Sequence, residues 1–428
     1  MAADTIFALA SGAGRAGVAV VRLSGPGAGA ALAALAGSLP PPRTAVLRRL
    51  VHAGGEIDRA LLLWFPGPGS FTGEDVAELH VHGGRAVIAA LFAALAALGL
   101  RPAEPGEFSR RAVEHGKLDL TQAEAIADLV EAETEAQRRQ ALRQHHGALA
   151  DLYEGWRSRL IMALGRAEAA IDFSDDGVGE AEFDAARKAA IHISQEIRAH
   201  LDDAGRGEAL REGVRLAIIG PPNAGKSSLL NMLAKRDVAI VSDIAGTTRD
   251  VIEVRLDLGG VLVIAADTAG LRESADVIEA EGVRRALARA RAAHLTLLLL
   301  DASAEAPRAG LPDDLPADLI VWNKADLKPH TGISISLRTG EGVPMLLDLL
   351  RQKVQQKFTG EAPALTRARH RAALTEALAA LDHARTAAEP ELMAEDLRLA
   401  LRAVGRITGR VDVEEVLDFV FRDFCIGK

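Results

Sequence analysis

The sequence predicts a multidomain fold: an α+β N-terminal module, an α-helical domain, and an α/β domain inserted into the helical one. Three observations predict it. The first quarter of the chain alternates short β-like runs with Gly- and Pro-rich turns, and the middle alternates apolar strands with helices. The segments on both sides of that middle carry Ala, Glu, Arg and Leu at helical spacing. The predicted boundaries are 1–118 for the N-terminal module, 119–211 and 361–428 for the helical domain, and 212–360 for the inserted domain.

The N-terminal module contains both strand and helix patterns. Apolar runs flanked by turn residues predict strands at Gly17–Leu23, Ala60–Phe65 and Val76–Val81. An Ala- and Leu-rich run predicts a helix at Val87–Leu98. The uncharged stretch that holds this helix is too short to span a bilayer and is typical of a buried helix. An α+β module follows.

Composition narrows the class of protein. At 428 residues, 49% of them hydrophobic and 25% charged, the chain is long enough for two or three domains with their own cores. Its one cysteine, Cys425, excludes an intramolecular disulfide, and without a basic, apolar leader we expect a cytoplasmic location. The net charge of −9 argues against a generic polyanion binder. Nucleic-acid contact would need a local basic patch, at Arg110–Arg111 or Arg138–Arg139, although such short pairs are usually solvated faces.

A phosphate-binding loop begins the inserted domain. The predicted strand Val214–Ile219 runs into Gly220-Pro-Pro-Asn-Ala-Gly-Lys-Ser227, which is followed by the helical segment Ser228–Ala234. Backbone N–H groups of such a loop and the helix N-terminus surround phosphates. We expect Lys226 to reach the β- and γ-phosphates and Ser227 to offer its hydroxyl to Mg²⁺. A glycine-rich turn can imitate these letters by chance, but the strand and helix around them favour phosphate binding.

Two further segments have the spacing of nucleotide switches. Gly246-Thr-Thr-Arg-Asp250 places Thr248 where its hydroxyl completes a Mg²⁺ shell, although a Gly-Thr-Thr triplet alone is more often an ordinary turn. Asp267-Thr268-Ala269-Gly270 follows a strand, so that the acid can hold Mg²⁺ water and Gly270 can donate to a γ-phosphate. A hairpin through Gly259-Gly260 is expected to join two strands, at Val251–Leu258 and Val261–Ala266.

The base-recognition signal favours guanine. After the predicted strand Leu319–Trp322 stands Asn323-Lys324-Ala325-Asp326, whose terminal carboxylate can accept two N–H groups of guanine but is left unpaired by adenine. Ser336-Leu337-Arg338 stands where a further loop would back the base. The inserted domain is therefore predicted to be an α/β P-loop GTPase domain. Its expected nucleotide contacts are Asn223, Ala224, Gly225, Lys226, Ser227, Ser228, Gly246, Thr247, Thr248, Asp267, Thr268, Ala269, Gly270, Asn323, Lys324, Ala325, Asp326, Ser336, Leu337 and Arg338.

Two groups that many GTPases use for hydrolysis are not identified in the sequence. Leu271 follows Asp-Thr-Ala-Gly, so no glutamine is available there to orient the attacking water. The sequence identifies no arginine finger either. Another group must position water and offset the charge that develops between the β- and γ-phosphates.

The motifs together resemble one family, the MnmE (TrmE) tRNA-modification GTPases, over essentially the whole chain. The G-domain part of the resemblance includes Asp243-Ile-Ala-Gly-Thr-Thr-Arg-Asp250 and Asp267-Thr-Ala-Gly-Leu-Arg-Glu273. More specific are three motifs outside that domain: Phe71-Thr-Gly-Glu-Asp75, Gly106-Glu-Phe-Ser109 and the terminal Phe424-Cys-Ile-Gly-Lys428. The resemblance adds four nucleotide-loop residues to the expected site: Ser242, Asp243, Ile244 and Ala245.

The resemblance implies a K⁺-activated, homodimeric GTPase. It implies that K⁺ replaces the arginine finger and is held by Asn223, Ser242, Ile244 and Thr247; alternatively, Asn223 simply caps the loop. It also implies that Glu279 is the general base or water-orienting carboxylate. Without the family, Glu279 is one of several acids near a helix N-terminus, where acids are favoured in any case.

The resemblance also implies a folate site. Arg22, Glu78, Lys117 and the terminal Lys428 match positions that bind 5-formyl-tetrahydrofolate or a methylene relative, whereas each taken alone would be an ordinary surface charge. Cys425, beside Lys428, is a candidate catalytic nucleophile, with an inert thiol as the alternative.

The implied function is tRNA modification. With an FAD-containing partner flavoprotein, MnmG (GidA), in a heterotetramer, the protein would place an aminomethyl or carboxymethylaminomethyl group on C5 of the wobble uridine in tRNA. The one-carbon unit would come from folate, while GTP hydrolysis with Mg²⁺ and K⁺ would drive a conformational cycle. Two alternatives stay open: a GTPase switch for ribosome or complex assembly without folate chemistry, and a GTPase with a purely structural helical arm.

Overall fold

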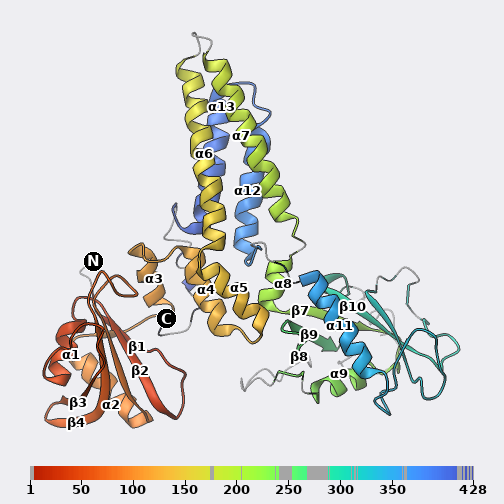
Figure 1. Ribbon diagram of the computed structural model, residues 1–428, viewed down its shortest axis with the longest axis horizontal. Coiled ribbons are helices and arrows are strands. Elements are labelled where there is room, and N and C mark those ends of the chain that lie inside the picture. Colours follow the sequence, from red (N-terminus) through yellow and green to blue (C-terminus); the bar gives the residue numbers. More distant parts are fainter. Residues whose placement is uncertain are drawn as a thin grey trace, which may run out of the picture. The chain divides into compact units, whose positions relative to one another are not determined.

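The computed structural model divides into two compact units. One consists of Met1–Ala127, His145–Met162 and Arg398–Lys428, and the other of Asp128–Gln144 and Ala163–Leu397. Figure 1 shows their helices and strands, coloured along the chain. The structure describes residues 4–173, 178–203, 205–236, 238–240, 253–267, 290–309, 311–312, 317–358 and 364–411, with single residues at 288, 315, 360, 417, 420, 421, 424 and 427.

A six-stranded sheet forms the body of the N-terminal module, in the order β3-β4-β5-β2-β1-β6. Its strands pair antiparallel, apart from the parallel pair β1–β6. The strands predicted near residues 17, 60 and 76 are confirmed as β2, β4 and β5. The bounds are β1 (Ile6–Leu9), β2 (Ala16–Ser24), β3 (Val46–His52), β4 (Gly55–Phe65), β5 (Val76–Gly83) and β6 (Arg101–Pro102).

Helices pack on both faces of this sheet because side chains alternate along each strand. Helices α1 (Ala28–Ala36) and α2 (Arg85–Ala97), the latter matching the predicted helix, share one core with Phe7 of β1. On the opposite face, Ile6 and Ala8 pack against Phe108 of α3 (Glu107–Glu114).

The helical segments flank the nucleotide domain in sequence, as predicted. Helix α4 begins after Asp119, whose Oδ1 accepts the backbone N–H groups of Thr121 and Gln122 and so caps the helix N-terminus. In the second unit, α7 and α12 pack along each other, and Arg198 pairs with Asp382 at 3.0 Å. The bounds are α4 (Leu120–Glu131), α5 (Glu135–His145), α6 (Ala148–Asp172), α7 (Val178–Leu201), α8 (Arg206–Glu212), α12 (Ala368–Ala384) and α13 (Pro390–Thr408).

The nucleotide domain has a second six-stranded sheet, in the order β12-β11-β10-β7-β9-β8. All neighbouring strands are parallel except β8, which pairs antiparallel with β9 across the predicted Gly259-Gly260 hairpin. Both glycines have positive φ. The bounds are β7 (Val214–Ile219), β8 (Glu253–Asp257), β9 (Leu262–Asp267), β10 (Leu295–Asp301), β11 (Leu319–Asn323), β12 (Ile333–Ser334), α9 (Lys226–Ala234) and α11 (Val343–Phe358).

Apolar strands in the middle of this sheet supply its core. In β10, Leu297 and Leu299 face one hydrophobic cluster, whereas Leu298 and Leu300 face another. A strand buried on both faces is typical of a parallel sheet covered by helices. The predicted fold class is therefore confirmed: an α+β module, a helical part and an α/β P-loop domain. The residue boundaries of the three-part division stay a prediction. Among the described helices, none combines bilayer-spanning length with sufficient apolar character.

Candidate functional site

The phosphate loop lies between β7 and α9, as predicted. A Cβ atom on Gly220 would lie 2.1 Å from the carbonyl oxygen of Leu299, so only glycine fits where the loop leaves the sheet. Asn223 and Gly225 have φ values of 61° and 104°, and Gly225 is the N-cap residue of α9. This left-handed turn leads directly into the N-terminus of α9, where free backbone N–H groups favour the binding of anions.

The loop lysine is held close to the loop itself. The Nζ of Lys226 donates to the carbonyl oxygens of Gly220 and Pro221, at 2.8 Å each. The ammonium group therefore lies against the backbone that precedes the helix. Ser227, the predicted Mg²⁺ ligand, follows directly on the first turn of α9.

Asn323 connects three of the predicted segments. Its side chain is 3% exposed, and Nδ2 donates to the carbonyl oxygen of Ala224 at 2.8 Å. Its Oδ1 accepts the backbone N–H of Leu337 at 3.2 Å. A Cβ atom on Gly225 would lie 2.4 Å from Asn323 Nδ2, so glycine is required for this contact. The phosphate loop and both base-side loops are thus one hydrogen-bonded unit.

The predicted guanine acid, Asp326, is held as a carboxylate. Ser336 donates from Oγ to Oδ1 at 2.6 Å, and Arg338 pairs with Oδ2 at 2.7 Å. The hydrogen bond from Ser336, together with the charge of Arg338, lowers the pKa of Asp326 below its ordinary value. The structure therefore brings the three predicted residues Asp326, Ser336 and Arg338 together.

Asp301 is a residue of this site that the sequence reasoning missed. Lys324, with φ 63°, pairs through Nζ with Asp301 Oδ2 at 2.5 Å. Burial raises the pKa of Asp301, but hydrogen bonds from Lys324 and Ser303 outweigh it and leave the pKa lowered. The available signal was an acid at the end of the apolar strand β10, next to the strand that carries Asn323.

Several predicted nucleotide and catalytic residues lie outside the described residues. Asp267 is the last residue of β9, and its backbone is in register with Ile218 of β7, at the edge where the phosphate loop begins. Among the residues that the structure describes, no group of three or more His, Cys, Asp or Glu could hold a metal ion. Outside them lie Ser242, Asp243, Ile244, Ala245, Gly246, Thr247, Thr248, Thr268, Ala269, Gly270, Glu279, Cys425 and Lys428.

Two of the predicted folate residues are neighbours in the N-terminal sheet. Arg22 and Glu78 are cross-strand partners of β2 and β5, and Arg22 Nη2 lies 2.8 Å from Glu78 Oε1. The Arg22 guanidinium carbon lies 5.6 Å from the ring centroid of Phe71 and 5.9 Å from that of Phe108. Lys117 donates instead to the carbonyl oxygen of Pro68, at 2.9 Å.

An ion-pair network next to this pair contains acids of the two N-terminal motifs, Phe71–Asp75 and Gly106–Ser109. Arg111 is 10% exposed and pairs with Asp4, Glu74 and Glu107, at 2.6, 3.1 and 2.8 Å. Arg101 pairs with Glu107 at 2.6 Å. Burial raises the pKa of Glu107, but hydrogen bonds from Arg101 and others outweigh it, so the pKa is lowered. Glu74 of one motif and Glu107 of the other thus meet one buried arginine.

The predicted basic pairs are therefore not free basic patches. Arg111 lies in the buried network, and Arg110 pairs with Glu114 at 3.0 Å. Arg138 and Arg139 both pair with Glu135 at 2.7 Å.

The C-terminal motif packs against the N-terminal module. A Cβ atom on Gly106, where φ is 67°, would lie 2.8 Å from Phe424 Cβ. A Cβ atom on Gly427, where φ is 101°, would lie 2.1 Å from the carbonyl oxygen of Leu9 at the end of β1. Two motifs more than 300 residues apart therefore lie in contact.

Comparison with known proteins covers the whole chain. Residues 120–425 match the family described as the MnmE helical domain, and residues 5–117 match the GTP-binding protein TrmE N-terminus. Relatives described as tRNA modification GTPase MnmE come from Paramagnetospirillum magneticum, 57% identical over 99% of this chain and 100% of its own, and Parvibaculum lavamentivorans, 58% identical with the same coverage. The Rhodospirillum rubrum relative is 55% identical over 100% of both chains.

A solved structure also matches part of the chain. The G domain of the T. maritima FeoB iron transporter is 22% identical and covers 34% of this chain and 99% of its own. Its TM-score is 0.25, too low for any structural or functional argument.

Proposed function

The chain belongs to the MnmE family of tRNA modification GTPases and is therefore a GTP hydrolase that acts in tRNA modification, and from this premise we propose a K⁺-activated cycle. The observation that carries the premise is identity of 55–58% over at least 99% of this chain and the full length of three relatives. In this proposal, the cycle serves modification of the wobble uridine at C5, with the FAD-containing flavoprotein MnmG (GidA) as partner.

GTP binding is proposed to use the loops that Asn323 connects. The N-terminus of α9 and Lys226 bind the phosphates, while Asp326 accepts the two N–H donors of guanine. Support for the base assignment comes from the geometry of Asp326, whose carboxylate has two acceptor oxygens and is held by Ser336 through Oδ1. Asn323 aligns the phosphate and base ends, and Asp301 positions Lys324.

Mg²⁺ is proposed to be held by Ser227 and Thr248. A hydroxyl on the first turn after the phosphate loop has the oxygen chemistry that Mg²⁺ prefers, which supports Ser227. When bound, the ion would offset charge on the β- and γ-phosphates. The backbone of Asp267 ends β9 beside β7, which suits an acid that orients the ion's water shell.

K⁺ activation is proposed to depend on Asn223, Ser242, Ile244 and Thr247. Asn223 occupies a left-handed position in the phosphate loop, and a side-chain oxygen there suits a cation ligand. When bound, K⁺ would offset the charge between the transferred and leaving phosphates, as an arginine finger does elsewhere. Glu279 is proposed to orient the attacking water.

The test of this proposal is GTP turnover by the full chain in KCl and in NaCl at equal ionic strength. We expect faster turnover in KCl, and we expect Asn223→Ala to remove that advantage while GDP still binds. Glu279→Ala should abolish turnover in both salts with GDP binding retained. Equal rates in the two salts would contradict K⁺ activation without touching the family assignment.

A reduced folate is proposed as the one-carbon donor, either 5-formyl- or methylene-tetrahydrofolate. Arg22, Glu78, Lys117 and Lys428 are proposed to bind it, and Cys425 is proposed as a nucleophile. Support comes from Glu78, whose carboxylate suits the donor edge of the pterin, and from Arg22 beside it, whose guanidinium carbon lies 5.6 and 5.9 Å from the ring centroids of Phe71 and Phe108. The basic groups of the set suit the glutamate tail.

The proposal extends to organisation. The boundaries are 1–118 for the folate and dimerisation module, 119–211 and 361–428 for the helical domain, and 212–360 for the G domain. The proposed active form is a cytoplasmic homodimer that assembles with MnmG and tRNA. If the protein failed to bind reduced folate and tRNA modification were intact in a deletion strain, the assembly-switch alternative would be favoured.

A further inference from the structure

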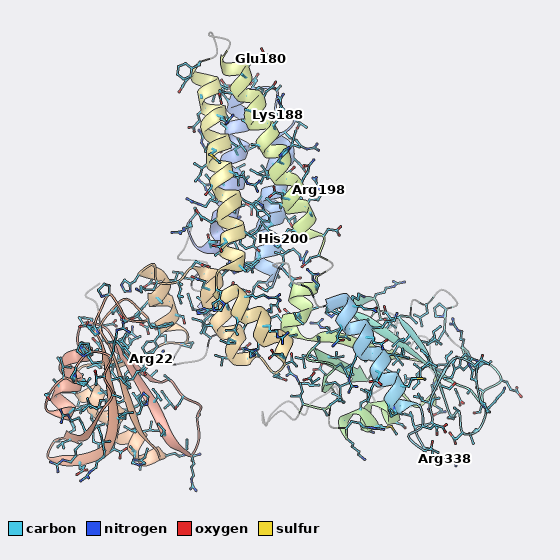
Figure 2. All side chains as sticks on the ribbon, viewed as in Figure 1. Arg22, Glu180, Lys188, Arg198, His200 and Arg338 are labelled. Atoms are coloured by element: carbon cyan, nitrogen blue, oxygen red, sulfur yellow. The ribbon has the colours of Figure 1, made fainter. Side chains whose placement is uncertain are left out.

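The carboxylate of Asp326 is contacted from two sides that differ in exposure. Ser336, which is fully buried, donates to Oδ1 at 2.6 Å. Arg338 pairs with Oδ2 at 2.7 Å; its side chain is 74% exposed, against 12% for Asp326. Figure 2 shows Arg338 at the edge of the nucleotide domain. The serine therefore holds the carboxylate from the interior, and the arginine covers it from the solvent side.

A base that pairs with Asp326 must approach from the solvent side, because Ser336 occupies the inner side. Guanine presents two adjacent N–H donors, which need a lone pair on each carboxylate oxygen. The guanidinium of Arg338 presents the same kind of planar donor fork and suits the same acceptors. Guanine and Arg338 are therefore alternative partners for one face of Asp326.

We propose that Arg338 is an internal competitor for guanine, a specificity-site residue that leaves Asp326 before the base can pair with it. This rests on the proposed role of Asp326 in guanine recognition. The consequence is a weaker affinity for guanine nucleotides than the remaining contacts would give. Because an exposed ion pair stabilises only modestly, the expected penalty is about two- to fivefold in Kd.

The loop around Arg338 is held by other groups, so its side chain can be removed without collapse. The backbone N–H of Leu337 donates to Asn323, and the N–H of Thr339 donates to Ser336 Oγ at 3.2 Å. The N–H of Ser336 donates to the carbonyl oxygen of Glu341 at 2.9 Å. A change of affinity in an Arg338 variant therefore reports on the side chain.

The first experiment measures the Kd of fluorescent mant-GDP for the full chain at low salt. We expect Arg338→Ala to bind about two- to fivefold more tightly, and Arg338→Lys, which keeps the charge, to stay near the unmodified protein. Arg351→Ala is the matched control, since Arg351 pairs with Asp348 within α11 and should leave the Kd unchanged. In high salt the gain should shrink, because exposed charges are screened. Unchanged or weaker binding by Arg338→Ala at low salt overturns the proposal.

A second experiment tests the competitor role of Arg338 separately from the proposed recognition of guanine by Asp326. Asp326→Asn should exchange GDP for xanthosine diphosphate, whose base carries an oxygen where guanine carries its amino group. Adding Arg338→Ala to that variant should leave the xanthosine diphosphate Kd unchanged, because an amide is no ion-pair partner. If Asp326→Asn keeps its preference for GDP, the base assignment and the competitor both fail. If the preference switches but Arg338→Ala has no effect in the otherwise unmodified protein, only the competitor fails.

Discussion

At the scale of single residues, Asn323 joins the loops of the nucleotide site. Both ends of its amide are used, towards Ala224 and Leu337, and the side chain is 3% exposed. Removing a buried partner leaves the remaining groups without the hydrogen bonds that they would make in water, and the cost is larger than the value of the bond. Asn323 therefore supports both the fold of the domain and the alignment of its loops.

We predict that Asn323→Ala lowers the free energy of unfolding by about 1–3 kcal/mol and weakens GDP binding at least about tenfold, which corresponds to about 1.4 kcal/mol. Denaturant unfolding and mant-GDP titration measure the two effects. Asn231→Ala, on an exposed position of α9, is the matched control and should change neither. Unaltered GDP affinity in Asn323→Ala would show that the loops align without this bridge.

Single residues also mark the limit of what the sequence predicts. The residue types at Asn323, Asp326 and Ser336 predict a guanine site because they follow predicted strands at the spacing of a base-recognition motif. The roles of Asp301 and Arg111 cannot be predicted from the sequence, because their contacts depend on which strands are neighbours in the sheet and on how a helix packs. Arg111 and Asp4, for example, are 107 residues apart in sequence.

At the scale of elements, the strand patterns predicted β7, β8, β9 and β11 of the nucleotide domain but not β10 and β12. The strand predicted at Val214–Ile219 has the same bounds as β7, because apolar runs in a parallel sheet are buried on both faces and end at a glycine turn. Helix α3 shows the opposite case. Its sequence, EFSRRAVE, suggests a charged surface helix, yet Glu107 and Arg111 are buried and pair with each other. Arg111 also pairs with Asp4 and Glu74, and Glu107 also pairs with Arg101.

The α3 network makes a prediction about pH. The pKa values of Glu107 and Asp4 are lowered in the folded protein from ordinary values of 4.5 and 3.8. Lowered acid pKa values mean that the stabilisation is complete above pH about 4.5 and is lost as the pH falls towards the folded-state values. We expect the melting temperature of the N-terminal module to fall between pH 5 and 3, as calorimetry can measure.

The matched variant is Arg111→Met, which leaves the half-buried Glu74 without its arginine and removes one of the two arginines that pair with Glu107. It should cost about 3 kcal/mol near pH 6, and the melting temperature should then depend less steeply on acid than in the unmodified protein. A parallel loss of stability in both proteins from pH 5 to 3 would place the acid sensitivity elsewhere.

At the scale of the whole molecule, the two ends of the chain belong to one compact unit, while the nucleotide domain belongs to the other. Phe424 packs on Gly106, and Gly427 lies against Leu9. The proposed folate residues are drawn from both ends of the chain, so their assembly depends on the seating of the C-terminal tail. The proposed GTP contacts come from neither end.

We therefore predict that Gly427→Ala weakens binding of 5-formyl-tetrahydrofolate, measured by calorimetry on the full chain, and leaves GTP turnover unchanged. The added methyl group would clash with the Leu9 carbonyl oxygen, whose distance from the new Cβ would be 2.1 Å. Gly99→Ala is the matched control, because Gly99 also has a positive φ, 85°, but nothing lies within 4 Å of its Cβ position. Equal folate affinity in both variants would separate the tail from the folate site.

The meeting of the two ends also sets an order of events during synthesis. The N-terminal sheet leaves the ribosome first, but the segment Arg398–Lys428 that completes its unit leaves last. At about 5–20 residues per second, the roughly 300 residues in between take about 15–60 s to translate. For that time helices α3 and α4 lack Phe421 and Phe424, so the apolar surface that these two rings cover, at Val113, Leu120 and Ala123, stays open to chaperones. The second unit, complete at residue 397, can fold first.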